Sequence, residues 1–282
     1  MAAPARRPKS RGLAQIIPID DPDDPRVDVY RQVRERDLVG RQGGFIAEGE
    51  VVLRVLLTGG GPHRAASLLV DAKRLAKLAP LTAHLPDQTP LYVAGQAVLD
   101  DIAGFHIHRG ILAHGLRAPD AGAAALIAAQ GDSALVLVLY GIANHDNMGG
   151  LFRNAAAFGV DAVLLDATSC DPLYRKSIRV SVGAALKLPF ARVAPGEDAL
   201  ALLEAANFDV LALSPGGAQP LTSLARPERA ALLLGAEGPG LPPAVLARTR
   251  TFSIPMAPGW DSLNVASAAA VALHELTRRT SG

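Results

Sequence analysis

The sequence predicts an α/β protein whose second half folds around a doubly wound parallel sheet. Short apolar runs alternate there with helix-like runs at regular spacing, as expected for parallel strands joined by helices. Hydrophobic residues make up 49% of the chain and aromatic residues only 4%, so the core must consist mostly of Ala, Leu and Val. Such a core suits helices packed on parallel strands. At 282 residues the chain is about twice the length of a typical domain, and we expect two domains.

The second half, residues 133–282, is predicted to contain six strands and five helices. The strands are expected at 135–139, 162–165, 190–193, 210–213, 231–234 and 251–254, and the helices at 149–158, 177–185, 199–206, 243–248 and 263–278. Ligands of open α/β sheets bind in loops at the carboxyl ends of the strands. The polar loops that follow these strands are therefore the candidates for a functional site.

The first half is predicted to form a smaller α/β domain over residues 20–114. Strands are expected at 51–57, 67–70, 91–94 and 105–113, and helices at 29–39, 72–78 and 97–103. Asp71 is a plausible cap for the second of these helices. Residues 115–132 are rich in Ala and also contain Gly and Pro, which predicts a linker that carries a helix.

Residues 1–19 are predicted to be a basic, disordered tail. They contain Arg6, Arg7, Lys9 and Arg11 and no acidic residue. They lack the apolar segment of a secretory signal. A transit peptide and an RNA-contacting tail stay open as alternatives to a tail without a defined role.

Cysteine content and hydropathy point to a cytoplasmic protein without a membrane segment. Cys170 is the only cysteine, so neither an intramolecular disulfide nor a four-cysteine metal site can form. No apolar run reaches the roughly 18 residues of a membrane helix. The net charge of +1 supports nucleic-acid binding only weakly, although a local basic patch can be hidden in a neutral total.

Several common enzyme motifs are missing from the sequence. There is no Gly-x-Gly-x-x-Gly after the first strand of the second half, no Walker P-loop and no Gly-x-Ser-x-Gly elbow. His106 and His108 alternate on one predicted strand, but two ligands fall short of the usual three or four of a zinc site. We therefore expect no bound metal.

Residues 144–160 join a polar loop to a helix. Asn147 precedes Gly149 and Gly150, which allows a tight turn and a close approach by a ligand. Arg153 follows in the first turns of the helix, where a guanidinium can hold a phosphate group. The plain alternative, an Asn cap and an Arg paired with a surface acid, is equally consistent with this segment alone.

Residues 232–241 place three glycines and a proline after an apolar strand. This density of glycine favours a backbone that lies close to a ligand, although an ordinary strand-to-helix turn is the plain alternative. Glu237 lies in the middle and would repel an anion. A cationic or hydroxyl-rich ligand therefore matches the loop better than a phosphate.

Residues 254–273 form a third strand, loop and helix segment. Ser262 and Asn264 precede the helix, and both are favoured capping residues. A helix has one N-cap, so capping does not readily explain both. At least one of them is a candidate for ligand binding.

Together these segments resemble the three motifs of the SpoU family of AdoMet-dependent RNA 2′-O-ribose methyltransferases, in the knotted SPOUT superfamily. The resemblance covers about residues 135–276. Asn147-Met148-Gly149 with Arg153 resembles the first motif, 234–241 the second, and Ile254-Pro255-Met256 with 262–265 the third. Residues 181–184 with 188–189 also resemble the family, and 45–49 and 108–113 more loosely resemble the substrate-binding extension of many members.

The resemblance implies AdoMet as methyl donor, no metal, and a trefoil knot in the C-terminal domain. It also implies a homodimer with the AdoMet pocket near the subunit interface. Arg153 would engage RNA phosphate and help to deprotonate the 2′-hydroxyl, Ser262 and Asn264 would orient Arg153 and the ribose, and Asn147 would shape the pocket. The expected AdoMet-binding residues are Leu234, Gly235, Glu237, Gly238, Gly240, Ile254, Met256 and Leu263.

The resemblance further implies that the N-terminal domain recognises structured RNA, with rRNA favoured over tRNA. A tRNA 2′-O-methyltransferase is the alternative within the same chemistry. A non-catalytic RNA-binding or ribosome-assembly protein on the same fold is the alternative from another class. Methylation of a base fits the motifs less well.

Overall fold

The chain divides between Arg117 and Ala118 into two units, which are described separately. The computed structural model describes residues 15–31, 43–260 and 262–278. Most of the expected helix at 29–39, and residues 1–14 of the expected tail, lie outside these ranges.

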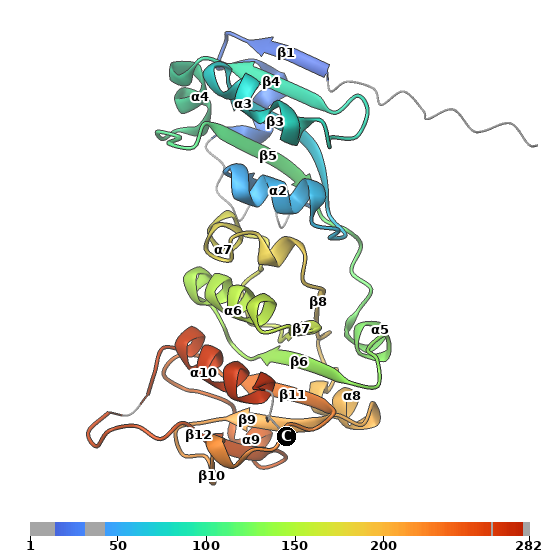
Figure 1. Ribbon diagram of the computed structural model, residues 1–282, viewed down its shortest axis with the longest axis vertical. Coiled ribbons are helices and arrows are strands. Elements are labelled where there is room, and N and C mark those ends of the chain that lie inside the picture. The colour runs from blue at the N-terminus through green and yellow to red at the C-terminus, as the bar shows by residue number, and fades with distance from the viewer. Residues whose placement is uncertain (1–14, 32–42, 261, 279–282) are drawn as a thin grey trace, which may run out of the picture. The chain divides into compact units, whose positions relative to one another are not determined.

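The C-terminal unit is built on a seven-stranded sheet in which every pairing is parallel. The strand order is β10-β12-β9-β11-β6-β7-β8 (Figure 1). The strands are β6 (Ala134–Leu139), β7 (Ala162–Leu165), β8 (Phe190–Arg192), β9 (Asp209–Leu213), β10 (Gln219–Pro220), β11 (Arg229–Leu234) and β12 (Arg250–Ser253). The parallel α/β sheet predicted for this half is confirmed; the trefoil knot stays a prediction.

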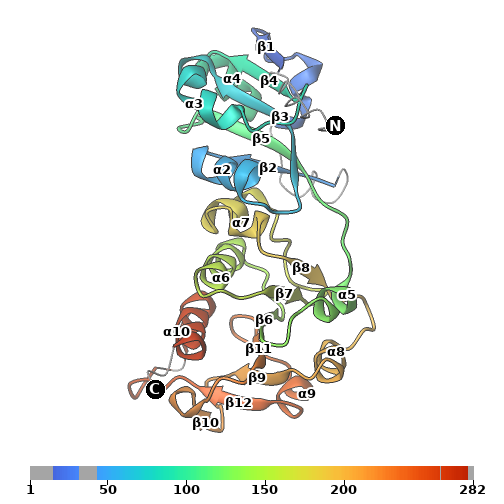
Figure 2. The same ribbon diagram turned by 45° about the vertical axis from the view of Figure 1, so that its right-hand side comes forward.

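Helices cover both faces of this sheet, as Figures 1 and 2 show. They are α5 (Ala123–Ala128), α6 (His145–Ala157), α7 (Arg175–Val180), α8 (Ala199–Ala205), α9 (Pro243–Leu246) and α10 (Val265–Thr277), with the 3-10 turns η3 (Ala184–Leu186) and η4 (Leu221–Ser223). Alternate residues of β6 belong to two separate cores. Leu135, Leu137 and Leu139 pack with α6 and α10, whereas Val136 and Val138 pack with α5 and α8. Burial on both faces explains why these strands are continuous apolar runs.

The N-terminal unit contains a mixed five-stranded sheet of order β1-β4-β3-β5-β2. Its strands are β1 (Gln15–Ile19), β2 (Gly44–Glu48), β3 (Arg64–Asp71), β4 (Pro90–Ala94) and β5 (Ile111–Leu116). Its helices are α2 (Glu50–Thr58), α3 (Leu75–Thr82) and α4 (Gln96–Ala103), with the 3-10 turns η1 (Pro25–Tyr30) and η2 (Ala72–Arg74). β5 runs antiparallel to both β2 and β3.

Two expected strands of this half differ from the structure, and one observed strand is missing from the prediction. Residues 51–57 form part of helix α2 rather than a strand. The buried residues Val52, Leu53 and Leu56 follow helical spacing. The strand was expected because this segment contains β-branched valines, which favour strands. The fully buried β2 was not predicted as a strand. The strand expected at 105–113 begins only at Ile111, because Gly104 ends α4 in a left-handed conformation and a loop follows.

The predicted tail and linker both contribute residues to packed structure. Residues 15–19 form β1, which pairs in parallel with β4, and Ile19 is 1% exposed, so the tail boundary at residue 19 is wrong. The helix in the expected linker is α5, whose Ala123 and Ile127 are buried in the core with α8. None of the helices in the described ranges is both long and apolar enough to cross a membrane.

His114 of β5 should make the N-terminal unit less stable in mild acid. Burial lowers the pKa of its imidazole below the ordinary value of 6.5. Its Nε2 is buried and has no partner among the described residues. As pH falls through about 6.5 the unfolded chain binds a proton that the folded chain does not, so the free energy of unfolding decreases. The decrease continues until the folded imidazole itself titrates.

Hydrogen exchange of β2 and β5 amides, corrected for the intrinsic pH dependence, should show lower protection at pH 5.5 than at pH 7.5. His114→Gln should remove most of this difference, because its amide does not titrate. An unchanged pH dependence in His114→Gln would show that other groups cause it.

Candidate functional site

A cavity of about 440 Å³ lies at the carboxyl ends of β9, β11 and β12. These three strands are neighbours in the sheet, so the loops that follow them meet at one edge. The lining residues come from the end of β9 and the loop after it (Leu213, Ser214, Pro215), the end of β11 and its loop (Leu234 to Leu241), Leu246, the loop after β12 (Ile254, Met256) and the start of α10 (Ser262, Leu263, Asn264, Val265, Ala268).

The loop after β11 folds back on itself, and its glycines make this possible. A Cβ on Gly235 would lie 2.3 Å from the carbonyl carbon of Gly240 and from the amide nitrogen of Leu241. The Gly240 amide donates a 3.0 Å hydrogen bond to the Ala236 carbonyl. Gly238 and Gly240 have φ of +86° and +69°, which suit glycine. The glycines are therefore needed for the shape of the loop, whatever ligand the loop binds.

Asn264 is the N-cap of α10. Its Oδ1 accepts hydrogen bonds from the amides of Ala266 at 2.9 Å and Ser267 at 3.3 Å. Ser262 does not share this role and is exposed at the cavity wall. Capping thus accounts for one of these two residues and leaves the Ser262 hydroxyl available to a ligand.

The side-chain nitrogen Nδ2 of Asn264 connects all three motif segments. It donates to Oδ1 of Asn147 in α6 at 2.8 Å and to Oε1 of Glu237 in the β11 loop at 3.0 Å. Asn147 is 8% exposed and lies behind the cavity wall, whereas Glu237 is exposed and lines the cavity. One side chain thus caps α10 and joins its start to α6 and to the β11 loop.

The first motif lies inside a helix rather than in a loop. α6 begins at His145, where Asn144 caps it by accepting from the amides of Asp146 and Asn147. A Cβ on Gly149 would lie 2.6 Å from Cβ of Val180 in α7, and one on Gly150 would lie 2.9 Å from Cβ of Ala266 in α10. The expected close approach is therefore made by helices and not by a ligand.

Arg153 is exposed on α6 and does not line the cavity. It forms no ion pair with the residues that the structure describes. Its helical neighbour Asn154 donates a 2.7 Å hydrogen bond to the Ala266 carbonyl, which fixes α6 against α10. Arg153 therefore lies outside the cavity, and its expected role toward RNA stays a prediction. The guanidinium is free to contact a molecule at the surface.

All eight residues expected to bind AdoMet line the cavity, together with Ser262 and Asn264. The prediction did not include the end of β9 and the loop after it in the cavity wall. The residues concerned are Leu213, Ser214 and Pro215. The signal for this loop was present, since an apolar strand is followed there by Ser, Pro and two glycines. The same rule that selected the other loops would have selected this one.

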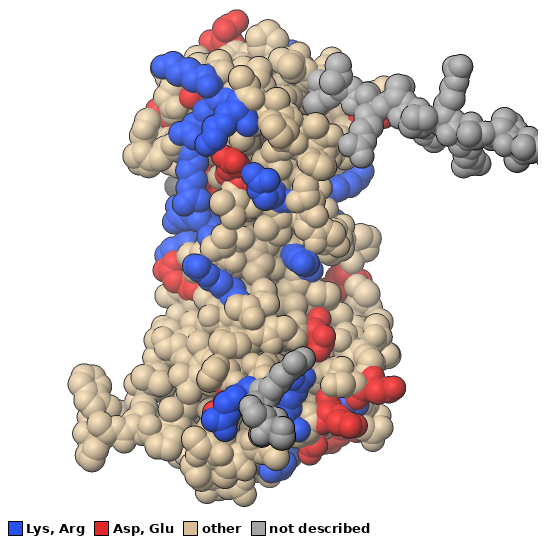
Figure 3. All heavy atoms as spheres, in the orientation of Figure 1, with Lys and Arg blue, Asp and Glu red and all other residues tan. Residues whose placement is uncertain are grey.

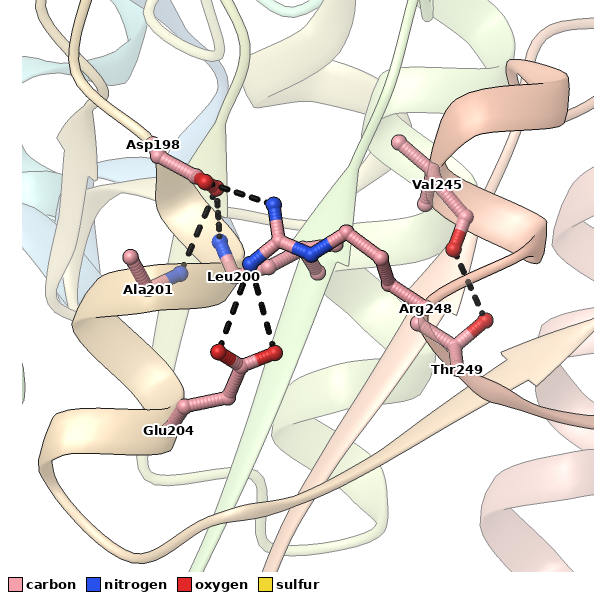
Figure 4. Close-up of polar contacts among 7 residues, drawn as sticks. All are labelled: Asp198, Leu200, Ala201, Glu204, Val245, Arg248 and Thr249. Carbon is pink, nitrogen blue, oxygen red and sulfur yellow. Dashed lines mark hydrogen bonds and ion pairs between the residues drawn. The ribbon is translucent and has the colours of Figure 1, made fainter.

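An ion-pair network joins the end of α9 to α8 (Figure 4). Arg248, which follows α9, contacts Asp198 at 2.6 Å and Glu204 at 3.3 Å, and these acids lie at the start and near the end of α8. The hydrogen bond from Arg248, aided by those from the α8 amides, lowers the pKa of Asp198. This arrangement fixes α9, whose Leu246 lines the cavity.

The described residues that line the cavity carry a single formal charge. Glu237 is the one acidic side chain among the lining residues, and aliphatic side chains with backbone amides and carbonyls form most of the wall. The described residues contain no group of three or more His, Cys, Asp or Glu suited to a metal. The His106 and His108 rings lie 4.5 Å apart in the N-terminal unit, and His106 hydrogen-bonds to Asp100.

Comparison with known families identifies this arrangement. Residues 134–274 match the model of the SpoU rRNA Methylase family. The chain belongs to the SpoU family. The matched range contains the whole cavity and all three motif segments.

Two bacterial relatives resemble most of the chain. An uncharacterised tRNA/rRNA methyltransferase of Mycobacterium tuberculosis is 40% identical over 268 residues, which cover 92% of this chain and 90% of the relative. The 23S rRNA (guanosine-2′-O-)-methyltransferase of Salmonella typhi is 30% identical over 220 residues, which cover 76% and 89%.

Solved structures agree with this assignment. An RNA 2′-O ribose methyltransferase superposes with a TM-score of 0.73 at 26% identity, covering 92% of this chain and 98% of its own. An AdoMet-bound rRNA methyltransferase from Sinorhizobium meliloti superposes with a TM-score of 0.77 at 21% identity, covering 93% and 97%. At that identity the second likeness shows the fold alone.

Proposed function

We propose that this SpoU protein transfers a methyl group from AdoMet to a ribose 2′-hydroxyl of structured RNA, with rRNA as the favoured substrate. The observation that carries the proposal is the cavity at the ends of β9, β11 and β12, with Glu237 and Asn264 joined on its wall. Two relatives whose names specify 2′-O methylation of RNA support the choice of acceptor.

The cavity fits AdoMet in size and chemistry. Its volume of about 440 Å³ lies within the range of small-molecule sites. The aliphatic wall, including Leu213, Leu246 and Ile254, suits an adenine ring, and backbone groups at the strand ends can bind ring nitrogens and ribose hydroxyls. Glu237 complements a ligand that carries cationic centres.

In this reaction AdoMet supplies a methyl group that is already activated by its sulfonium centre. The protein must therefore hold donor and acceptor in line and accept the proton of the 2′-hydroxyl. We assign Arg153 to an RNA phosphate and to the acceptor ribose, with Ser262 positioning the ribose and Asn264 acting through its hydrogen bonds to Asn147 and Glu237. A guanidinium is a poor base, so holding the phosphate is its main role.

AdoMet and its demethylated product should bind without a metal. Calorimetry in excess chelator should show saturable binding of both, because the described cavity offers carboxylate, backbone and aliphatic groups and no metal-ligand set. Absence of binding by either nucleoside would overturn the enzymatic proposal and favour a non-catalytic RNA-binding protein. A second experiment addresses the substrate. Mapping of 2′-O-methyl groups in total RNA from a deletion strain distinguishes rRNA from tRNA as the methyl acceptor.

We also propose a division of labour between the two units, in a cytoplasmic homodimer. The C-terminal unit contains every cavity residue, so AdoMet binding needs nothing before Ala118. Trp260, Leu263 and Val271 are 75%, 44% and 44% exposed and offer apolar contacts to a second copy. The N-terminal unit would add contacts to the RNA.

Deleting residues 1–117 should leave a folded, dimeric protein that binds AdoMet but binds RNA weakly. Phosphate contacts dominate affinity for nucleic acids, so their loss should appear as weaker RNA binding at matched salt. Light scattering, AdoMet titration and RNA binding of the truncated and full-length proteins test this. An unfolded truncated protein, or one with full RNA affinity, contradicts the division.

A further inference from the structure

One end of the N-terminal sheet brings three separate segments together. β5 runs antiparallel to β2 and β3, so its start lies beside their ends. The Asp71 amide donates to the Gly110 carbonyl at 2.9 Å, and the Gly49 amide donates to the Ile111 carbonyl at 3.1 Å. The start of α2, the turn η2 and the loop 104–110 therefore share one surface.

Two arginine side chains lie on this surface, each next to a glycine. A Cβ on Gly49 would lie 2.7 Å from Cδ of Arg109, so that side chain lies over the start of α2. A Cβ on Gly110 would lie 2.8 Å from Cδ of Arg74, whose guanidinium donates to the His108 carbonyl at 3.0 Å. Arg74 is thus held by a backbone carbonyl, and the Arg109 side chain lies against Gly49.

Further cations extend the surface along α2 and α3. Lys77 and Arg54 share Glu50, at 3.4 Å and 3.3 Å. Lys73 and Arg109 are exposed and form no ion pair within the described ranges, while Asp71 beside them is buried. Figure 3 shows lysine and arginine side chains gathered along one side of this unit. We call Lys73, Arg74, Lys77 and Arg109 the sheet-end cations.

Aromatic rings lie next to these cations. The loop 104–110 carries Phe105, which is 39% exposed, and the exposed imidazoles of His106 and His108. His106 is held by a 2.7 Å hydrogen bond to Asp100, and its ring packs against that of His108. Cations interleaved with exposed rings suit a nucleic acid with unpaired bases, because cations bind phosphates and rings stack on bases.

We propose that the sheet-end cations bind phosphates of the RNA and that Phe105 and His108 stack on unpaired bases of the same strand. This inference rests on the proposed function, because the RNA is the methyl acceptor. An acidic protein partner would use the cations but would have no need for the stacking loop. The surface therefore selects a single-stranded or looped RNA segment.

Lys73→Gln and Arg109→Gln, singly and combined, test the phosphate contacts with protein-free rRNA from a strain that lacks this gene. Each lost contact should reduce the slope of log affinity against log salt by about 0.7–0.9. At low salt the double variant should bind roughly tenfold or more weakly, while AdoMet affinity stays unchanged. Arg64→Gln is the matched control, since exposed Arg64 begins β3 at the opposite end of the sheet.

Phe105→Ala tests the stacking. It should weaken binding of a single-stranded oligouridylate about tenfold or more, since stacking contributes about 1–3 kcal/mol per base, and should affect a perfect duplex less. Unchanged RNA affinity and salt slope in the double variant overturn the proposal, even if the parent protein methylates RNA. Failure of the parent to methylate RNA would instead overturn the proposed function. If Arg109→Gln does not fold, the single variant Lys73→Gln, at an exposed position, still tests the phosphate contacts.

Discussion

Arg153→Ala should abolish methyl transfer while leaving AdoMet affinity nearly unchanged. Arg153 is exposed on α6 and absent from the cavity wall, so its loss removes no contact with the cofactor. Losing the group that holds the RNA phosphate and the acceptor ribose in line with the donor costs about a hundredfold or more in rate. Single-turnover methyl transfer to rRNA and AdoMet titration measure the two effects separately.

Arg153→Lys is the matched variant. It keeps the charge but lacks the planar guanidinium fork, so we expect only partial recovery of the rate. Thermal unfolding should be almost unchanged in both variants, because exposed substitutions usually alter stability by less than about 0.5 kcal/mol. Near-normal turnover in Arg153→Ala would show that the role assigned to this residue is wrong.

Gly235→Ala should have the opposite signature, with a loss of AdoMet affinity. The added Cβ would lie 2.3 Å from the Gly240 carbonyl carbon and the Leu241 amide nitrogen, and these backbone atoms must move. Overpacking costs about 1–3 kcal/mol. The displaced residues line the cavity, so this cost should appear in AdoMet binding. A tenfold change in Kd corresponds to about 1.4 kcal/mol, so AdoMet affinity should fall about ten- to hundredfold.

Gly216→Ala provides the control for Gly235→Ala. Gly216 follows Pro215 in the loop after β9, has no positive φ, and an added Cβ would meet no atom within 4 Å. It should therefore bind AdoMet like the parent protein. If Gly235→Ala also bound AdoMet normally, the shape of the β11 loop would not determine cofactor binding.

The sequence alone predicts most elements of the C-terminal unit and most of its cavity. Fully buried strands such as β6 and β11 appear as short apolar runs, because both their faces are covered. Polar loops after such strands are recognisable without a structure. The prediction is less reliable for a short apolar run, which is compatible with both a strand and a helix. In α2 the valines indicate a strand, whereas the spacing of the buried residues is that of a helix.

The order of strands in the sheet determines which loops meet, and the local sequence pattern does not contain this order. Only the sheet shows that β9 lies between β11 and β12, which adds Leu213, Ser214 and Pro215 to the cavity. Only tertiary packing shows that Gly149 and Gly150 admit α7 and α10 rather than a ligand.

The bridge from Asn264 to Asn147 and Glu237 spans 117 and 27 residues of sequence. The sequence determined which residues carry polar chemistry, because side-chain type and local spacing are written in it. The tertiary structure decided which of them meet, because contacts between distant residues depend on how the strands are ordered in the sheet.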